Sequence, residues 1–160
     1  MVIIETDRLV IRKFAEPDAN DLFLQSNQKS AREELPDEVL GSIEAAANKI
    51  RFFNEQYEGG RILVYALGIK GGCDSVIGHI SLSPIKEGME IGYFISEDYT
   101  GKGYAKEAVK AFTQWGKCDL GLKEIYGIVK PTNIASIKIL ENSGYVLVEE
   151  KERKCWGKIM

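Results

Sequence analysis

The stretch Thr100-Gly101-Lys102-Gly103-Tyr104-Ala105 determines how this sequence is interpreted, because it joins a strand pattern to a helical one. Residues 89–95 before it are rich in β-forming side chains, and the apolar residues after it recur at helical spacing. Glycine lets the backbone approach a ligand closely, and the free N–H groups at a helix start favour anions. The stretch therefore predicts a glycine turn between a strand and a helix, suited to binding an anion.

Two familiar phosphate-binding motifs do not fit this turn. A dinucleotide fingerprint requires Gly or Ala where Lys106 stands, and a P-loop requires Ser or Thr after Gly-Lys, where Gly103 stands. At this point a phosphate site of another kind and a plain strand-to-helix connection both remain open.

The segments before the turn predict a strand, two helices and then a meander of three strands. Residues 9–14 alternate as a strand should, and Pro17 then opens a helical pattern. Residues 39–53 follow the spacing of an amphipathic helix that ends before Gly59-Gly60. The three strands of the meander are predicted at residues 62–69, 76–83 and 89–95.

The segments after the turn predict two helices and three more strands. The first helix has an apolar face made by Ala105, Ala108, Val109, Phe112 and Trp115. A strand follows at residues 125–129, Pro131 blocks its extension, and Asn133 can cap a helix that stops at Gly144. Strands at residues 145–148 and 155–159 complete the sheet.

This order of elements predicts an α+β or mixed α/β fold, in which helices cover a mixed sheet. The chain has 160 residues, with 44% hydrophobic and 28% charged side chains, so we expect a single globular domain over residues 1–160.

Composition argues against several classes of function. A formal net charge of -3 disfavours nucleic-acid binding, and no apolar run approaches the roughly 18 residues of a membrane span. No signal-peptide pattern follows Met1, so a cytoplasmic location is expected. The single histidine leaves no metal-ligand cluster and no Ser-His-Asp set. Three widely spaced cysteines suggest reduced, mostly structural thiols: Cys73, Cys118 and Cys155.

Several linked motifs resemble the GNAT N-acetyltransferase superfamily, in particular its RimJ/RimL-type ribosomal-protein branch. These are Glu5-Thr6-Asp7-Arg8-Leu9-Val10-Ile11-Arg12, Pro17-Asp18-Ala19, Ile77-Gly78, Glu90-Ile91-Gly92-Tyr93, Asn133-x-x-Ser136 and Gly144-Tyr145. The resemblance covers nearly the whole chain. It implies a central mixed, mostly antiparallel sheet of about seven strands flanked by about four helices.

The same resemblance implies acetyl-CoA as cosubstrate, with no metal. The family's pyrophosphate signature maps onto Thr100, Gly103 and Ala105, within the turn that also holds Gly101, Lys102 and Tyr104. Thr100 departs from the family's Gln or Arg, which should weaken the clamp modestly because the implied contacts are mainly to the main chain.

The pantetheine arm is implied to lie along the strand at residues 90–95, where Gly92 would permit a β-bulge and Phe94 and Ile95 would present backbone groups. Asn133 would contact the coenzyme as well as cap its helix. Any of four lysines could meet the 3′-phosphate or simply be solvated: Lys102, Lys106, Lys110 and Lys138.

Two residues are candidates for proton transfer. Many superfamily members carry a catalytic tyrosine where Leu140 stands, so Ser136, one turn earlier, is the candidate acid for the departing thiolate, or else a helix serine bonded to its own backbone. Glu90 is the candidate base, or else a solvated strand-end glutamate. His79 is the weaker candidate base.

The predicted activity is direct acetyl transfer from acetyl-CoA to a primary amine, either a protein N-terminus or a small molecule, by a monomer or homodimer. The acceptor would be set by residues 26–57, which carry the least recognisable pattern. A coenzyme A-binding module that has lost catalysis is the alternative, suggested by Thr100 and Leu140.

Overall fold

The computed structural model describes the backbone of residues 1–151 and 154–159, and the side chains of residues 1–150 and 157–159. Its strands are β1 (Val2–Glu5), β2 (Leu9–Arg12), β3 (Leu63–Ile69), β4 (Gly78–Ile85), β5 (Gly88–Ile95), β6 (Ile125–Val129), β7 (Val146–Lys151) and β8 (Lys154–Ile159). Its α-helices are α1 (Ala19–Ser26), α2 (Lys29–Glu34), α3 (Ile43–Gln56), α4 (Tyr104–Cys118) and α5 (Ile134–Asn142). Short 3-10 helices are η1 (Glu16–Asp18), η2 (Pro36–Glu38) and η3 (Glu97–Tyr99).

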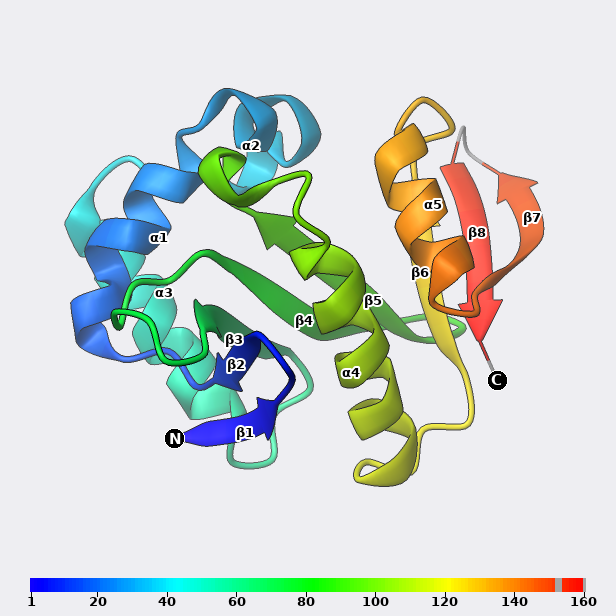
Figure 1. Ribbon diagram of the computed structural model, residues 1–160, viewed down its shortest axis with the longest axis horizontal. Coiled ribbons are helices and arrows are strands. Elements are labelled where there is room, and N and C mark those ends of the chain that lie inside the picture. Colours follow the sequence, from blue (N-terminus) through cyan, green and yellow to red (C-terminus); the bar gives the residue numbers. More distant parts are fainter. Residues whose placement is uncertain (152–153, 160) are drawn as a thin grey trace.

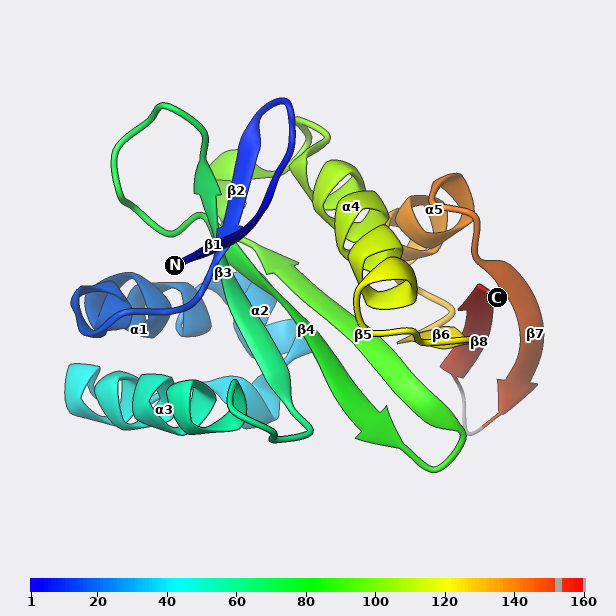
Figure 2. The same ribbon diagram turned by 90° about the horizontal axis from the view of Figure 1, so that it is seen from below.

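The strands form one sheet in the order β1-β2-β3-β4-β5-β6-β8-β7. Every neighbouring pair is antiparallel except β5 and β6, which are parallel. Helices α4 and α5 lie on one face of the sheet, and α1 and α3 lie on the other (Figures 1 and 2). This mixed, mostly antiparallel sheet with helices on both faces confirms the predicted fold class.

A hydrophobic core lies on each face of the sheet, because side chains alternate along the strands. On β4, Ile80 and Leu82 belong to the core beneath α4, together with Val109 and Phe112 of that helix. On the opposite face the second core joins β3 to α1 and α3. It is formed by Phe14, Ala19, Leu22, Ala46, Ile50, Phe53, Val64, Ala66 and Val76.

The structure differs from the sequence prediction in three elements. Strand β1 and helix α2 were not predicted, so the sheet has one more strand and the chain one more helix than the approximate counts. Helix α3 begins at Ile43 and not at residue 39, because the side chain of Ser42 accepts a hydrogen bond from the Ala45 N–H and caps the helix there.

The N-terminal segment is fastened to the glycine turn and to α4 through the Glu107 carboxylate. Thr6 Oγ1 donates to Glu107 Oε1 at 2.6 Å, and Arg8 donates to the same carboxylate through its backbone N–H at 2.9 Å and through Nε at 2.7 Å. Arg8 Nη1 also donates to the Lys102 carbonyl at 2.8 Å, and its guanidinium lies 4.6 Å from the centroid of the Tyr104 ring. Arg8 therefore holds the glycine turn in place through the Lys102 carbonyl and the Tyr104 ring.

These contacts control the ionisation of Glu107. Burial by itself would raise the pKa of this carboxyl, but the hydrogen bonds from Thr6 and Arg8 outweigh burial and hold the pKa below its ordinary value. Glu107 is thus a carboxylate at neutral pH, and its negative charge in the first turn of α4 also suits the helix macrodipole.

We predict that Glu107→Gln lowers the free energy of unfolding at pH 7 by about 2 kcal/mol, the size of hydrogen bonds to a charged group. Because the folded pKa is depressed, the wild-type advantage is present above the unfolded pKa of about 4.3 and is lost as the pH falls through the folded value. Urea unfolding of both proteins at pH 7 and below pH 4 measures this. Glu141→Gln, at an exposed glutamate of α5, is the control, and equal losses in the two variants would contradict the prediction.

Candidate active site

A cleft opens where β5 and β6 part. Their parallel pairing joins only Met89, Glu90 and Ile91 to residues 125–127, although β5 continues to Ile95 and β6 to Val129. The cleft has a volume of about 510 Å³. Residues of β5, β6, α2, the glycine turn and α5 line it, and Figure 1 shows α4 and α5 on its two sides. The backbone of β5 after Ile91 is left facing this space, without pairing to β6 in the described part of the chain.

The predicted bulge at Gly92 is wrong. The register of β5 with β4 is continuous from Gly78 opposite Ile95 to Ile85 opposite Gly88. The end of the pairing with β6, and not a bulge against β4, frees the backbone of β5 beside the cleft. Glycine at position 92 makes room for the neighbouring strand, because a Cβ there would lie 2.8 Å from Ser81 Oγ on β4.

The glycine turn lies at one end of the cleft, which Thr100 and Ala105 line. Gly101 has φ +74° and Gly103, the N-cap of α4, has φ +81°, both in the left-handed region that glycine adopts without strain. Gly101, Lys102 and Gly103 are exposed but do not line the cleft, so a ligand would meet them beyond its end. Tyr104 packs against the core and beneath Arg8 and does not line the cleft.

Helix α5 forms the opposite wall. Asn133 caps the helix, since its Oδ1 accepts a hydrogen bond from the Ser136 N–H at 3.2 Å, and both residues line the cleft. Leu140, also in the lining, is buried over Gly127 of β6, where a Cβ would meet Leu140 Cδ1 at 2.6 Å. The Leu140 side chain thus fits against β6 because Gly127 beneath it has no side chain.

Sequence reasoning missed Tyr93 as a possible proton donor. Its hydroxyl donates to the Ser136 carbonyl at 3.3 Å and so reaches from β5 to α5 across the cleft. Burial raises the pKa of this phenol, which keeps it protonated at neutral pH. The signal was present in the motif Glu90-Ile91-Gly92-Tyr93, but only the topology shows that this side chain meets Ser136.

The two candidate bases lie in different surroundings. Glu90 lines the cleft where the strands part, opposite Ser83 of β4 and Tyr126 of β6. His79 does not line this cleft, and its ring stacks on Phe94 at 5.8 Å between centroids. Burial lowers the pKa of His79 to about 4, so the imidazole is neutral at pH 7 and a poor acceptor for an ammonium proton. Position favours Glu90, because it lines the cleft and His79 does not.

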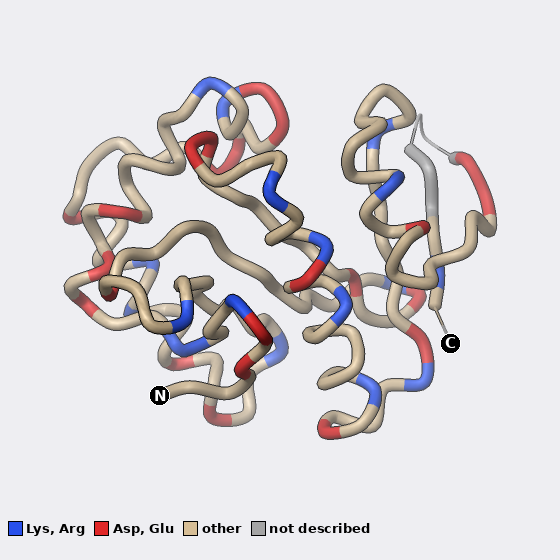
Figure 3. The backbone as a smooth tube through the Cα atoms, viewed as in Figure 1, with Lys and Arg blue, Asp and Glu red and all other residues tan. Residues whose placement is uncertain are grey.

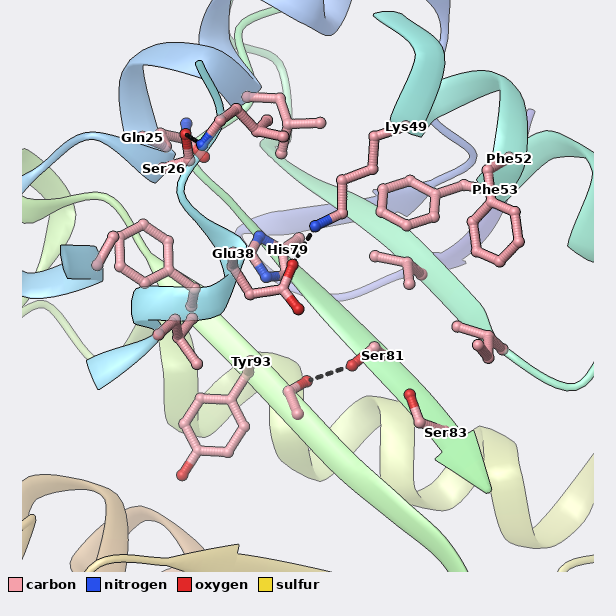
Figure 4. A pocket seen from close by; sticks show the side chains of 18 residues that line it. Gln25, Ser26, Glu38, Lys49, Phe52, Phe53, His79, Ser81, Ser83 and Tyr93 are labelled. Carbon is pink, nitrogen blue, oxygen red and sulfur yellow. Dashed lines mark hydrogen bonds and ion pairs between the residues drawn. The ribbon is translucent and has the colours of Figure 1, made fainter. Parts of the chain in front are cut away.

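A second pocket, of about 320 Å³, lies on the other face of β5 between that strand and helices α1 and α3 (Figure 4). Four residues line both this pocket and the cleft, so the two spaces meet along β5: Leu35, Gly92, Tyr93 and Phe94. Helix α2 and the segment after it, inside the residues 26–57 assigned to acceptor choice, contribute Ala31, Leu35 and Glu38.

Helix α2 is bonded to the loop that leads into the glycine turn. Gln28 donates to Ser96 Oγ at 2.8 Å and accepts from the Glu97 N–H at 2.9 Å, and the Ser30 N–H donates to Glu97 Oε1 at 2.8 Å. A carboxylate oxygen of Glu34 lies 3.9 Å from the ammonium nitrogen of Lys130, which follows β6. The helix therefore spans the cleft between its two sides.

Charged side chains lie in and near the cleft. Basic residues occur along α4 and on α5 (Figure 3), and the four candidate lysines at positions 102, 106, 110 and 138 are exposed. Among the described residues no group of three or more His, Cys, Asp and Glu could hold a metal ion. Cys73 and Cys118 are free thiols and exposed, so they are not packed structural residues, while the side chain of Cys155 lies outside the described residues.

Comparison with known proteins agrees with this architecture. A family model for the acetyltransferase (GNAT) domain matches residues 8–146. YoaA of Bacillus subtilis (strain 168), an uncharacterised N-acetyltransferase, is 29% identical over 151 residues, which cover 89% of this chain and 82% of YoaA.

Two solved structures share the fold. A GNAT-family acetyltransferase from Bacillus anthracis has a TM-score of 0.80 and 22% identity, covering 98% of this chain and 97% of its own. The ribosomal L7/L12 alpha-N-protein acetyltransferase RimL, in complex with coenzyme A, has a TM-score of 0.84 and 15% identity, covering 100% of this chain and 98% of its own. The extent of the family match shows that the chain belongs to the GNAT acetyltransferase family.

Proposed function

We propose that the protein is a cytoplasmic N-acetyltransferase of the RimJ/RimL type, a single domain over residues 1–160 that transfers the acetyl group of acetyl-CoA to a primary amine. The observation that carries this proposal is the cleft between β5 and β6. It gathers seven of the site residues proposed from sequence, which come from three separate segments: Glu90, Phe94, Ile95, Thr100, Ala105, Asn133 and Ser136. RimL, whose fold this chain shares, was solved with coenzyme A.

The cleft and the glycine turn at its end suit the two parts of a pantetheine diphosphate, its phosphates and its pantetheine chain. The exposed glycines at positions 101 and 103 and the positive end of α4 favour phosphate oxygens. The unpaired edge of β5 offers backbone groups to the pantetheine amides and to the thioester carbonyl, which N–H donors would polarise. Exposed lysines near α4 and α5 are available to the 3′-phosphate.

Direct transfer requires that the amine loses a proton and the coenzyme thiolate gains one. Glu90 is proposed as the base, acting on the amine through water at the closed end of the cleft. Ser136 or Tyr93 would protonate the thiolate, and the acid need not be strong, because an ordinary thiol pKa is near 8.5. Positioning of the two substrates would supply most of the acceleration.

A coenzyme A-binding module without catalysis is the second candidate function. Thr100 and Leu140, which depart from the family pattern, favour it. The presence of Glu90, Ser136 and the Tyr93 phenol in one cleft favours an enzyme. Release of free thiol in the presence of amines separates the two functions.

We predict that acetyl-CoA raises the unfolding temperature of the protein, whereas NAD and ATP at equal concentration do not. A ligand that binds only the native state stabilises by RT ln(1 + [L]/Kd), about 2.7 kcal/mol at one hundred times Kd. Differential scanning fluorimetry over a concentration series measures the shift. An equal shift with NAD would overturn the coenzyme assignment.

We predict that Gly101→Val weakens acetyl-CoA binding at least about 10-fold, because it strains the turn and narrows the approach to its N–H groups. Gly121→Val is a matched control: Gly121 has φ +68° against +74° for Gly101, and neither position has a heavy atom within 4 Å of a built Cβ. Both variants should lose similar stability, but only Gly101→Val should change the Kd measured by calorimetry. Equal dissociation constants would place the phosphates elsewhere.

We predict that Glu90→Gln lowers turnover near neutral pH by about 10²-fold or more and removes the acidic limb of the pH profile, with little change in coenzyme binding. Turnover at saturating amine, measured across pH for wild type and variant, tests this. Full activity with an unchanged acidic limb would return Glu90 to a structural role and leave water as the acceptor.

The acid is identified by comparing Ser136→Ala with Tyr93→Phe, which removes only the phenol oxygen. We predict that the variant lacking the true donor turns over acetyl-CoA more slowly than the wild type. The acidic limb of its pH profile, which belongs to Glu90, should stay in place. Unchanged turnover in both variants would mean that solvent protonates the thiolate.

A further inference from the structure

The pocket on the α1 and α3 side of β5 is mainly apolar. Its walls come from α1, α2 and the segment after it, α3, β3, β4 and β5, and β4 contributes the polar residues His79, Ser81 and Ser83 (Figure 4). The apolar side chains are Leu22, Ala31, Leu35, Leu40, Phe52, Phe53, Ile62, Val64 and Phe94. Phe52 remains 42% exposed although it is a large aromatic residue, so apolar surface continues from the pocket to solvent. At about 320 Å³ the pocket is at the lower end of the range for small-molecule sites.

The charges in this pocket cancel. Its ionisable lining residues are Glu38, Lys49 and His79. Glu38 and Lys49 form an ion pair beside His79, and the imidazole is neutral at pH 7 because burial lowers its pKa to about 4. A ligand carrying a further charge on its body would meet no opposite charge there and would have to be desolvated without compensation.

Two polar atoms of the lining residues are buried and unpaired. The buried His79 Nδ1 and Gln25 Oε1 have no hydrogen-bond partner among the described residues. Buried polar atoms are normally paired, but these two lie behind the pocket walls and offer no surface to a ligand while the side chains keep their positions. The surface left to a ligand is mainly apolar, which indicates an apolar ligand with limited polarity.

Gly92 joins this pocket to the coenzyme cleft. It lines both spaces, and Ser81 Oγ of β4 takes the place that a side chain at this position would fill. A molecule in the pocket can therefore place one end against the strand at the position where the β5 edge becomes free of β6. Glu90, two residues earlier, lies on the same side of the strand as Gly92.

Resting on the proposed acetyltransferase function, we propose that the acceptor is a small primary amine borne by an uncharged apolar body, of aryl-alkyl or alkyl type, and not a polyamine or a charged peptide terminus. The apolar body occupies the pocket between Phe52 and β4, and its amine reaches the thioester at Gly92. The amine nitrogen forms the new bond to the acetyl carbon, and the carbon to sulfur bond breaks. One nitrogen proton passes to Glu90 through water, and the departing thiolate takes a proton from Ser136 or Tyr93, which regains one from the nitrogen that became the amide.

The proposal is tested by initial rates with acetyl-CoA and three acceptors, read as free thiol release. The acceptors are 2-phenylethylamine, spermidine and a charged tetrapeptide with a free amino terminus. We expect kcat/KM for 2-phenylethylamine to exceed the other two by about 10²-fold, as several buried carbon groups would give. Preference for spermidine or the peptide would overturn the acceptor class while leaving acetyl transfer intact.

Two variants on α3 locate the acceptor. Phe52→Ala should lower kcat/KM for 2-phenylethylamine about 10-fold without changing the KM for acetyl-CoA. Ile43→Ala, at a residue of the same helix that is 48% exposed and outside the pocket lining, is the matched control and should change neither value. Equal effects of the two variants would remove the acceptor from this pocket.

The stabilisation by acetyl-CoA separates failure of this proposal from failure of the proposed function. If acetyl-CoA stabilises the protein but none of the three amines releases thiol, the acceptor class is overturned and the coenzyme site stands. If acetyl-CoA neither binds nor reacts, the acetyltransferase function and the acceptor class are both overturned.

Discussion

The site depends on one constraint in the sheet: the parallel pairing of β5 with β6 stops at Ile91 and Gly127. Each strand remains paired on its other side, β5 with β4 and β6 with β8. The sheet therefore keeps its continuity and both of its cores while a cleft opens inside it. Buried backbone groups normally need partners, so a strand edge facing a cleft is a surface prepared for a ligand with amide and carbonyl groups.

Side chains from α5 and β5 meet at the parted strands. Leu140 packs on Gly127, which lets α5 lie close to β6, and Tyr93 reaches from β5 to the Ser136 carbonyl. At the far end, Arg8 and Glu107 connect the glycine turn to the N-terminal strands. The cleft is thus held by contacts between segments that lie apart in sequence, by 43 residues for Tyr93 and Ser136 and by 99 residues for Arg8 and Glu107.

Sequence patterns predicted the parts of this arrangement that are local. The glycine turn, the Asn133 cap and the meander follow from residue types and spacing, and the structure has each of them. Helix α2 was missed because only Ala31 of its six residues is buried, so it has no apolar period, and its place is fixed by bonds to Ser96 and Glu97. The prediction of a bulge at Gly92 was wrong, because a glycine within a strand does not show with which neighbouring strand the pairing ends. The link between Tyr93 and Ser136 depends on topology, which residue spacing does not encode.

The two spaces on either side of β5 differ in the chemistry that they offer, and this difference assigns their ligands. The cleft toward β6 offers the free backbone of β5, and the left-handed glycines and the N-terminus of α4 lie beside its end, which suits a long, hydrogen-bonding anion. The pocket toward α3 combines aromatic and aliphatic walls with a neutralised ion pair, which suits a compact apolar molecule. Because both spaces include Gly92, Tyr93 and Phe94, the strand itself is the only separation between them along this stretch of the described structure. The proposed reaction requires that the reactive ends of the two ligands meet beside Gly92, where Ser81 Oγ of β4 takes the place that a side chain would fill.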